Sequence, residues 1–411
     1  MKLPDSLAST GSLLVILLTL AGVAIGRYPG VRMNRATIAV VGATALVALG
    51  ALSLEQAFDA IDLNTLVLLF AMMVINANLR LAGFFELIAA RLAGAALSPR
   101  QLLAVTVLSA GTLSALFLND TIVLVFTPLI VEVATAVGLN PIPYLIALAT
   151  AANIGSSATI IGNPQNMLIG VSSGISFTRF FAYLSPVALV GCVVIWAVIA
   201  FMYRAELQRH EVHVHLGRRI RIFKPLLLKS SVASILLLGA LIAGVAVPLA
   251  ALGAASILLI TRRLKPERVF REIDWSLLVF FSGLFVVTAA VETVGLNGRL
   301  LDFIESSADR GVVGLTVISA VLSNLISNVP AVMILRSVVS NLADPERGWL
   351  TLAMATTLAG NLTLLGSVAN LIVAEVARRH HVRLSFWEYL RAGVPITILT
   401  LIFGALWLIV V

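Results

Sequence analysis

The sequence predicts an all-α polytopic membrane protein with two inverted-topology repeats, about ten spans, two re-entrant hairpins and two broken helices. Composition, apolar run length and a set of motifs that occurs twice predict this fold class. Of the 411 residues, 60% are hydrophobic and 12% are charged, whereas a soluble domain carries about 25% charged residues. Such a chain cannot be solvated on all sides, and its apolar stretches have the roughly 20-residue length that crosses a bilayer.

The first apolar run, SLLVILLTLAGVAIG, is expected to be a span and not a cleaved leader, because neither a basic leader nor a small-residue cleavage site accompanies it. The net charge of +8 comes from basic residues in short segments between the apolar runs. This charge therefore reports membrane topology and does not indicate a nucleic-acid partner. The one cysteine, Cys192, excludes a disulfide framework and a thiolate metal site.

The repeats are visible as motif pairs that occur in the same order in both halves. The pairs are LEQAFDAID at 54–62 with PERVFREID at 266–274, LNDT at 118–121 with SNVP at 327–330, TIIGNPQNMLIG at 159–170 with TLLGSVANLIVA at 363–374, and SFTRFFAYLSP at 176–186 with SFWEYLRAGVP at 385–395. One such pair could arise by chance, but an ordered series predicts two copies of one structural unit.

The halves meet at the polar, arginine-rich stretch 203–224, which is expected to be cytoplasmic. The expected spans are 11–28, 36–52, 64–80, 142–168 and 184–203, then 226–244, 246–260, 276–292, 350–376 and 390–410. Because each half has an odd number of spans, the second copy has the opposite orientation in the membrane. This assignment of spans puts most of the 28 Lys and Arg residues on the cytoplasmic side. It divides the chain into an N-terminal repeat (1–203), a linker (204–225) and a C-terminal repeat (226–411), with both termini outside the cell membrane.

The segments 101–138 and 312–342 are expected to be hairpins whose tips stop near the bilayer midplane. Arg336 lies eight residues beyond Asn328, which is about 12 Å of helix. With the tip at the far surface, Arg336 would lie near the bilayer centre, at a cost of at least ~3 kcal/mol. With the tip at the midplane, Arg336 reaches the interface and can snorkel. The segment 84–98 is expected to be an amphipathic interfacial helix.

Polar residues concentrate at these tips and in the two interrupted apolar stretches. Hairpin tips expose backbone groups that lipid cannot satisfy, so they must line protein or a watery cavity. Gly and Pro interrupt the helices at 142–168 and 350–376, and paired interruptions of this kind indicate a transport site. The candidate binding residues are Asn119, Asp120, Thr121, Ser327 and Asn328 at the tips, and Asn153, Ser156, Ser157, Thr159, Asn163, Asn166, Asn361, Thr363, Ser367 and Asn370 in the broken helices.

The motifs ALFLNDTIVLVFTP, SNVPAVMIL and LLGSVANLIV resemble the ion transporter superfamily. They are most similar to its bacterial arsenite/antimonite permeases and related sodium/proton antiporters, and the resemblance covers nearly the whole chain. The superfamily's carboxylate carriers have Ser-Asn-Thr at both tips, whereas here only Asn119 and Asn328 match. The resemblance implies that these two asparagines contact the substrate or coupling ion, and that a hairpin-bearing domain moves in an elevator-like way.

We therefore expect a secondary active transporter that exports arsenite, antimonite or a similar small oxyanion in exchange for protons. Asp120 is the expected proton-coupling group, because a buried carboxylate can take up and release a proton within one cycle. Two other roles stay open for Asp120, a helix N-cap and a ligand of Na⁺ together with Asn119 and Asn328. The alternative functions are a sodium/proton antiporter and a sodium-coupled carboxylate or sulfate symporter.

The sequence shows no cluster of residues suited to catalysis, no cofactor fingerprint and no metal site, so an enzyme is not expected. The expected partners are a small inorganic or organic anion or metalloid, and the lipid bilayer of the cell inner (plasma) membrane. The coupling ion is H⁺, with Na⁺ as the alternative. The sequence leaves open whether the protein forms a homodimer.

Overall fold

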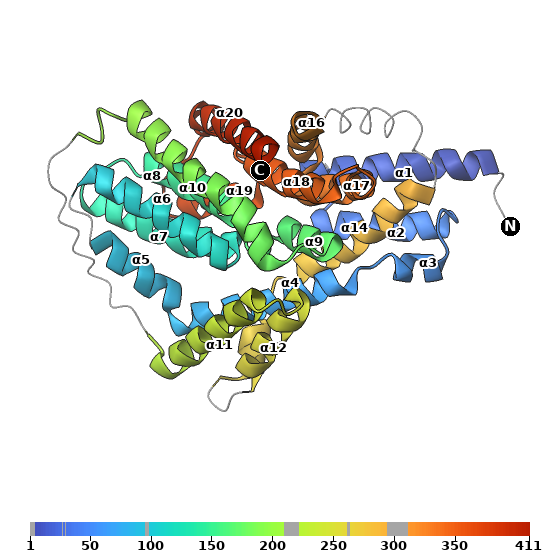
Figure 1. The fold of residues 1–411 in the computed structure, drawn as a ribbon, viewed down its shortest axis with the longest axis horizontal. Coiled ribbons are helices and arrows are strands. Elements are labelled where there is room, and N and C mark those ends of the chain that lie inside the picture. The colour runs from blue at the N-terminus through green and yellow to red at the C-terminus, as the bar shows by residue number, and fades with distance from the viewer. Residues whose placement is uncertain are drawn as a thin grey trace.

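The computed structural model describes residues 5–26, 28, 30–94, 98–208, 222–260, 264–293 and 311–411, and all regular structure in these ranges is helical. The all-α prediction is therefore confirmed (Figure 1). The helices of the N-terminal half are α1 (Asp5–Ile25), α2 (Arg35–Ala48), α3 (Leu54–Asp59), α4 (Leu63–Ala82), α5 (Phe84–Gly94), α6 (Pro99–Leu116), α7 (Asn119–Ala136), α8 (Ile142–Ser156), α9 (Pro164–Ser173) and α10 (Phe177–Met202). Those of the C-terminal half are α11 (Lys224–Ile242), α12 (Val247–Leu259), α13 (Pro266–Phe270), α14 (Trp275–Thr293), α16 (Gly311–Ile326), α17 (Asn328–Ser340), α18 (Pro345–Ala359), α19 (Val368–Arg379) and α20 (Phe386–Val410).

The first motif pair forms the same local structure in both halves. A short helix, α3 or α13, is followed by a long apolar helix, α4 or α14. Asp62 accepts hydrogen bonds from the backbone of Asn64 and Thr65 at the start of α4. Its counterpart Asp274 accepts one from the backbone of Leu277 at the start of α14. The repeated aspartate therefore satisfies N–H groups that the first helical turn leaves unpaired.

The two halves contact each other reciprocally. Helix α4 packs against α12 while its counterpart α14 packs against α2, the counterpart of α12. In the same way, α7 packs against α19 while α17 packs against α9, and Figure 1 shows α17 and α18 beside α9. Reciprocal packing is what a pseudo-two-fold axis between two inverted repeats produces.

Both predicted hairpins and both broken helices are present. Only Phe117 and Leu118 separate α6 from α7, and only Ser327 separates α16 from α17. We call residues 117–121 tip 1 and residues 326–330 tip 2. Seven residues separate α8 from α9, and eight residues separate α18 from α19. These gaps, residues 157–163 and 360–367, are called break 1 and break 2.

Among the described residues, α4, α7, α10, α11, α14 and α20 are long and apolar enough to cross a membrane. Helix α7 belongs to a hairpin, so its length alone does not make it a crossing. Outer helices also expose large apolar side chains, such as Leu189 and Val193 on α10, which are 65% and 64% exposed. Such an exposed apolar surface suits a lipid environment. The predicted helix at 84–98 is observed as α5, while residues 209–221 of the predicted linker lie outside the described range.

Candidate functional site

Tip 1 is fastened to break 1 through Asn119. The backbone N–H of Asn119 donates to the carbonyl oxygen of Gly162 at 3.1 Å. Its side-chain Nδ2 donates to Oδ1 of Asn153 on α8 at 3.2 Å, and its Oδ1 accepts from the Asp120 backbone at 2.9 Å. The tip backbone is therefore satisfied inside the protein, as its burial in an apolar bundle requires.

Asn153 joins the N-terminal half to the C-terminal half. Its Nδ2 donates to Oδ1 of Asn361 at 2.8 Å and to Oδ1 of Asn370 at 3.0 Å. Its Oδ1 accepts from the Ser367 hydroxyl at 3.0 Å, in addition to the bond from Asn119. The Asn153 side chain thus connects tip 1 to break 2.

A reciprocal contact runs from break 1 to α18. Asn163 Nδ2 donates to the Ser156 hydroxyl at 2.9 Å and to the Thr357 hydroxyl at 3.4 Å. By the offset that pairs Asn163 with Ser367, Thr357 takes the place of Asn153 in the C-terminal repeat. The bonds from Asn163 to Thr357 and from Ser367 to Asn153 are therefore equivalent. The pseudo-two-fold axis passes through this polar cluster.

The paired asparagines Asn166 and Asn370 satisfy the carbonyl groups at the two breaks. Asn166 Nδ2 donates to the carbonyl oxygens of Ser156 and Thr159, at 3.1 and 3.0 Å. Asn370 Nδ2 makes the matching bonds to those of Gly360 and Thr363, at 2.8 and 3.1 Å. The C-terminal ends of α8 and α18 would otherwise expose these carbonyls.

Tip 2 reaches break 2 through Asn328. Its Oδ1 accepts from the Ser323 hydroxyl at 2.6 Å, and the same hydroxyl contacts the Thr356 carbonyl oxygen at 3.1 Å. Asn328 Nδ2 lies 3.3 Å from where a Cβ on Gly360 would stand. Ser327 adopts φ 78°, which is uncommon for a residue with a Cβ and marks the sharp turn at this tip. Since Gly360 also bonds Asn370, both tips lie at one shared polar centre.

Asp120 is placed in the first turn of α7, where Leu118 occupies the N-cap position without a side-chain cap bond. The N-cap role is therefore wrong for Asp120. Its carboxylate is half-buried and makes no hydrogen bond to the described residues. The amino end of α7 favours a negative charge at this position. The carboxylate is thus available to a proton, a cation or a hydroxylated ligand.

Some predicted residues lie near the network without joining it through their side chains. The Ser157 hydroxyl bonds the carbonyl oxygen of Ile154 within its own helix turn. Thr363 contributes its carbonyl group, and Thr159 uses its hydroxyl to bond the Ala115 carbonyl oxygen in the hairpin arm. Thr121 and Ser327 belong to the tips, and their hydroxyls make no hydrogen bond to the described residues.

The prediction also missed residues that the structure brings to the site. Thr357 accepts from Asn163 and from Gln165, and it donates to Asn166. Ser323 and Asn324 fasten the last turn of α16 to α18. The alignment of the repeats carried a signal for Thr357, since it aligns with Asn153. For Ser323 and Asn324, the sequence offered only weak evidence, namely that two adjacent polar residues lie one helical turn before a tip.

Many side-chain amide donors of the site are occupied, whereas Asn328 Nδ2 has no acceptor among the described residues. Both hydrogens of the amide group have acceptors in five residues, which are Asn153, Asn163, Asn166, Asn324 and Asn370. Unoccupied acceptors include the Asp120 carboxylate, the hydroxyls of Thr121 and Ser327, and Asn324 Oδ1, which is buried without a partner among the described residues. No Lys, Arg or His side chain bonds any member of this network within the described ranges. Because it has free acceptors and no basic side chain, such a site suits a ligand that donates hydrogen bonds better than a multivalent anion.

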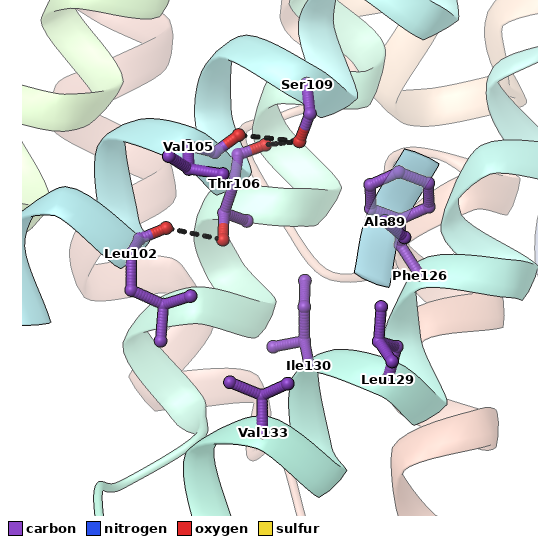
Figure 2. Close-up of a pocket in the computed structure, with 9 residues that line it drawn as sticks. All are labelled: Ala89, Leu102, Val105, Thr106, Ser109, Phe126, Leu129, Ile130 and Val133. Carbon is purple, nitrogen blue, oxygen red and sulfur yellow. Dashed lines mark hydrogen bonds between the residues drawn. The ribbon is translucent and has the colours of Figure 1, made fainter. Parts of the chain in front are cut away.

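Other features of the bundle lie outside this site. Arg336, the one basic residue within hairpin 312–342, places its guanidinium carbon 5.9 Å from the centroid of the Phe285 ring. This cation–π geometry compensates part of the cost of its burial. A small pocket between α5, α6 and α7 is lined mainly by apolar side chains (Figure 2). Its two hydroxyl groups, on Thr106 and Ser109, already bond carbonyl oxygens of their own helix.

Comparisons with known proteins agree with this architecture. Residues 14–359 match the family described as CitMHS, citrate transporter. The chain is 32% identical to the silicon efflux transporter LSI3 of Oryza sativa subsp. japonica, with 92% of each chain covered. It is 30% identical to a 46 kDa membrane protein of Mycobacterium leprae, covering 92% of this chain and 94% of that protein. It is 25% identical to the putative transporter arsB of Dictyostelium discoideum, covering 90% and 86%.

A solved structure, the crystal structure of the Alcanivorax borkumensis YdaH transporter with its unusual topology, shares the fold with a TM-score of 0.62. The superposition covers 99% of this chain and 97% of that chain, at 16% sequence identity. Together with the matched family and relatives, this likeness confirms the resemblance of the sequence motifs to the ion transporter superfamily. The chain belongs to the CitMHS citrate transporter family of the ion transporter superfamily, and it is a membrane transporter, not an enzyme.

Proposed function

We propose that this transporter exports a small hydroxylated metalloid, such as arsenite or antimonite, or a similar small oxyanion, in exchange for protons. One observation carries the proposal. The site shared by the two halves is an amide and hydroxyl network beside the Asp120 carboxylate, which has no hydrogen-bond partner among the described residues. Arsenite is uncharged at neutral pH and presents O–H donors, which such a site can bind without a basic residue.

The occupied amide donors favour a ligand that brings its own hydrogens. An unpaired buried acceptor is costly, so a ligand that donates to it gains free energy. An oxyanion with several charges would instead need cationic side chains, and no Lys, Arg or His side chain bonds the network within the described ranges. The names of two relatives, a silicon efflux transporter and a putative arsB, support the same chemical class.

Asp120 provides a simple basis for the exchange. An ionised carboxylate accepts an O–H group of the substrate, whereas a protonated one loses much of this ability. Substrate and proton then compete for the same group, which is the requirement for antiport. Loading on the cytoplasmic side would release the proton inward, and a proton from outside would replace the departing substrate.

The movement that alternates access is proposed to be elevator-like. The two hairpins and two broken helices bond each other at the site, so they would move as one body. Helices α1–α4 and α11–α14 would form the scaffold. The same proposal includes the division of the chain into repeat 1–203, linker 204–225 and repeat 226–411. It also places the linker in the cytoplasm, both termini outside, and the protein in the inner membrane.

The family description favours a second candidate, a citrate-like carboxylate carried by a sodium- or proton-coupled symporter. Such a substrate would need accompanying cations at this site. A sodium/proton antiporter that uses oxygen atoms of Asn119, Asp120 and Asn328 is the remaining alternative.

Transport into everted vesicles or proteoliposomes separates these candidates. Arsenite, antimonite, citrate, sulfate and Na⁺ would be compared under imposed proton and sodium gradients. The proposal predicts arsenite or antimonite movement driven by a proton gradient, with no requirement for Na⁺. Citrate or sulfate movement driven by Na⁺, with none of arsenite or antimonite, would overturn it.

A further inference from the structure

Five buried side-chain polar atoms without a hydrogen-bond partner among the described residues lie on two neighbouring helices of the C-terminal half, and others lie elsewhere in the bundle. Within the described residues, these atoms are Thr316 Oγ1, Ser319 Oγ and Asn324 Oδ1 on α16, and Tyr389 Oη and Thr397 Oγ1 on α20. We call these five residues the polar seam. Four of its side chains are at most 5% exposed, and α16 and α20 contact each other as well as α18. A buried hydroxyl with no partner is costly, so a cluster of them requires an explanation.

The N-terminal half has apolar residues at every equivalent position. The offset that pairs Asn119 with Asn328 also pairs Pro186 with Pro395. At this offset, the residues that replace the polar seam are Val107, Ala110, Ala115, Phe180 and Ala188. The polar groups at these five positions therefore belong to the C-terminal copy, while the counterpart of Ser323, Ser114, is also a buried serine without a partner among the described residues.

The polar seam converges on α18 and break 2. From α16, Asn324 Nδ2 donates to the carbonyl oxygen of Ala359 at 3.0 Å. On α20, Gly393 lies midway between Tyr389 and Thr397, and a Cβ there would stand 2.5 Å from the Asn361 carbonyl oxygen. The faces of α16 and α20 that carry the polar seam therefore meet α18 at the level of the site.

The spacing along α16 connects this seam to tip 2. Thr316 and Ser319 lie seven and four residues before Ser323, so the three hydroxyls share one helix face over about 10 Å. Ser323 continues the series, because its hydroxyl bonds Asn328 Oδ1 at tip 2. Residues three or four apart on a helix have Cβ atoms about 5–6 Å apart, a separation that one water molecule can bridge.

We propose that the polar seam holds ordered water molecules. Those beside Thr316, Ser319 and Thr397 form a hydrated path from the outer end of hairpin 312–342 to the site, and Tyr389, which lies on the cytoplasmic side of break 2 in the expected topology, marks the inner end of the path. Water supplies the partners that the five oxygen atoms lack. A chain of water and hydroxyl groups also passes protons, so the path would deliver the exchanged proton from the external side. Only this last role rests on the proposed function.

Radiolytic hydroxyl-radical footprinting of the full-length protein in lipid nanodiscs tests the water directly. Radicals form from water, so a buried side chain is modified quickly only where water lies beside it. Tyr389 and Tyr144 are both buried, at 0% and 1% exposure, but the Tyr144 hydroxyl bonds the Pro99 carbonyl oxygen. Tyr389 is expected to be modified several-fold faster than Tyr144. Equally slow modification of both would overturn the proposal, whatever the substrate is.

Substitutions borrowed from the N-terminal half test the role of the path. Thr316→Val, Ser319→Ala and Tyr389→Phe install the residues found at 107, 110 and 180. Proton-driven transport should fall several-fold, without a rise in melting temperature. A higher melting temperature with unchanged transport would show that the hydroxyls are dry and unused, which contradicts the proposal. Thr106→Val and Ser109→Ala are matched controls, since Figure 2 shows these hydroxyls bonded within α6, and neither should affect transport.

Discussion

Asn153 in the N-terminal half donates from Nδ2 to Oδ1 of Asn361 in the C-terminal half, at 2.8 Å. Both side chains are buried, at 2% and 0% exposure. Because Asn153 also bonds Asn119, Ser367 and Asn370, one residue ties a hairpin tip of one repeat to the break of the other. The candidate site therefore exists only when both repeats are in place.

Replacement of this residue should damage both stability and transport. Asn153→Ala removes four hydrogen bonds and leaves buried polar partners unsatisfied, at ~1–3 kcal/mol for each group that finds no new partner. Thermal unfolding in detergent and proteoliposome transport measure the effect. Ser157→Ala is the control, because its hydroxyl bonds only the carbonyl of Ile154 in its own helix. A stable and fully active Asn153→Ala variant would show that Asn153 is not the link described above.

Asp120→Asn should separate transport from proton coupling. The amide keeps the size of the side chain but cannot take up a proton. We expect substrate exchange between labelled and unlabelled pools to persist, while accumulation driven by a proton gradient is lost. Parallel exchange and gradient-driven assays in the same proteoliposomes check this outcome. Wild-type coupling in the variant would remove Asp120 from its assigned role.

Gly162→Ala should disrupt break 1. A Cβ at this position would lie 2.4 Å from the Ser156 carbonyl oxygen and 2.8 Å from that of Ser114, so the backbone must shift. Because Gly162 also accepts the bond from Asn119, tip 1 should lose its anchor and transport should be abolished.

Gly239→Ala in α11 is the matched control for this change. No atom lies within 4 Å of its added Cβ, and alanine raises helix propensity by roughly 0.8–1.0 kcal/mol over glycine. The control should be as stable as the wild type or slightly more so. Equal transport by both alanine variants would contradict the tight packing at break 1.

The hairpins and breaks could be predicted because their signals are local. Pro164 begins α9, where a missing N–H is harmless, and Asn163 and Ser367 cap the helices that follow the breaks. Residues of these types favour the end of one helix and the start of the next in any sequence, so they can be recognised without the tertiary structure. The repetition of these signals in both halves then indicated the inverted architecture, which the reciprocal helix contacts support.

The pairing of side chains could not be predicted because it depends on how distant segments meet. Asn153 and Asn361 are 208 residues apart in the chain. Ser323 and Asn324 look like ordinary polar residues of a helix until α18 is placed beside them. The N-cap role suggested for Asp120 failed for a related reason, since the tip geometry puts Leu118 at that position.

An electron cryo-microscopy map of the protein in lipid nanodiscs with arsenite would test the central claim most directly. We predict that Asn119 and Asn328 border one polar centre, that Asn153 bonds Asn361 across the halves, and that ligand density lies beside the Asp120 carboxylate. A map that places the two tips at opposite faces of the membrane, or the ligand away from both, would contradict the account.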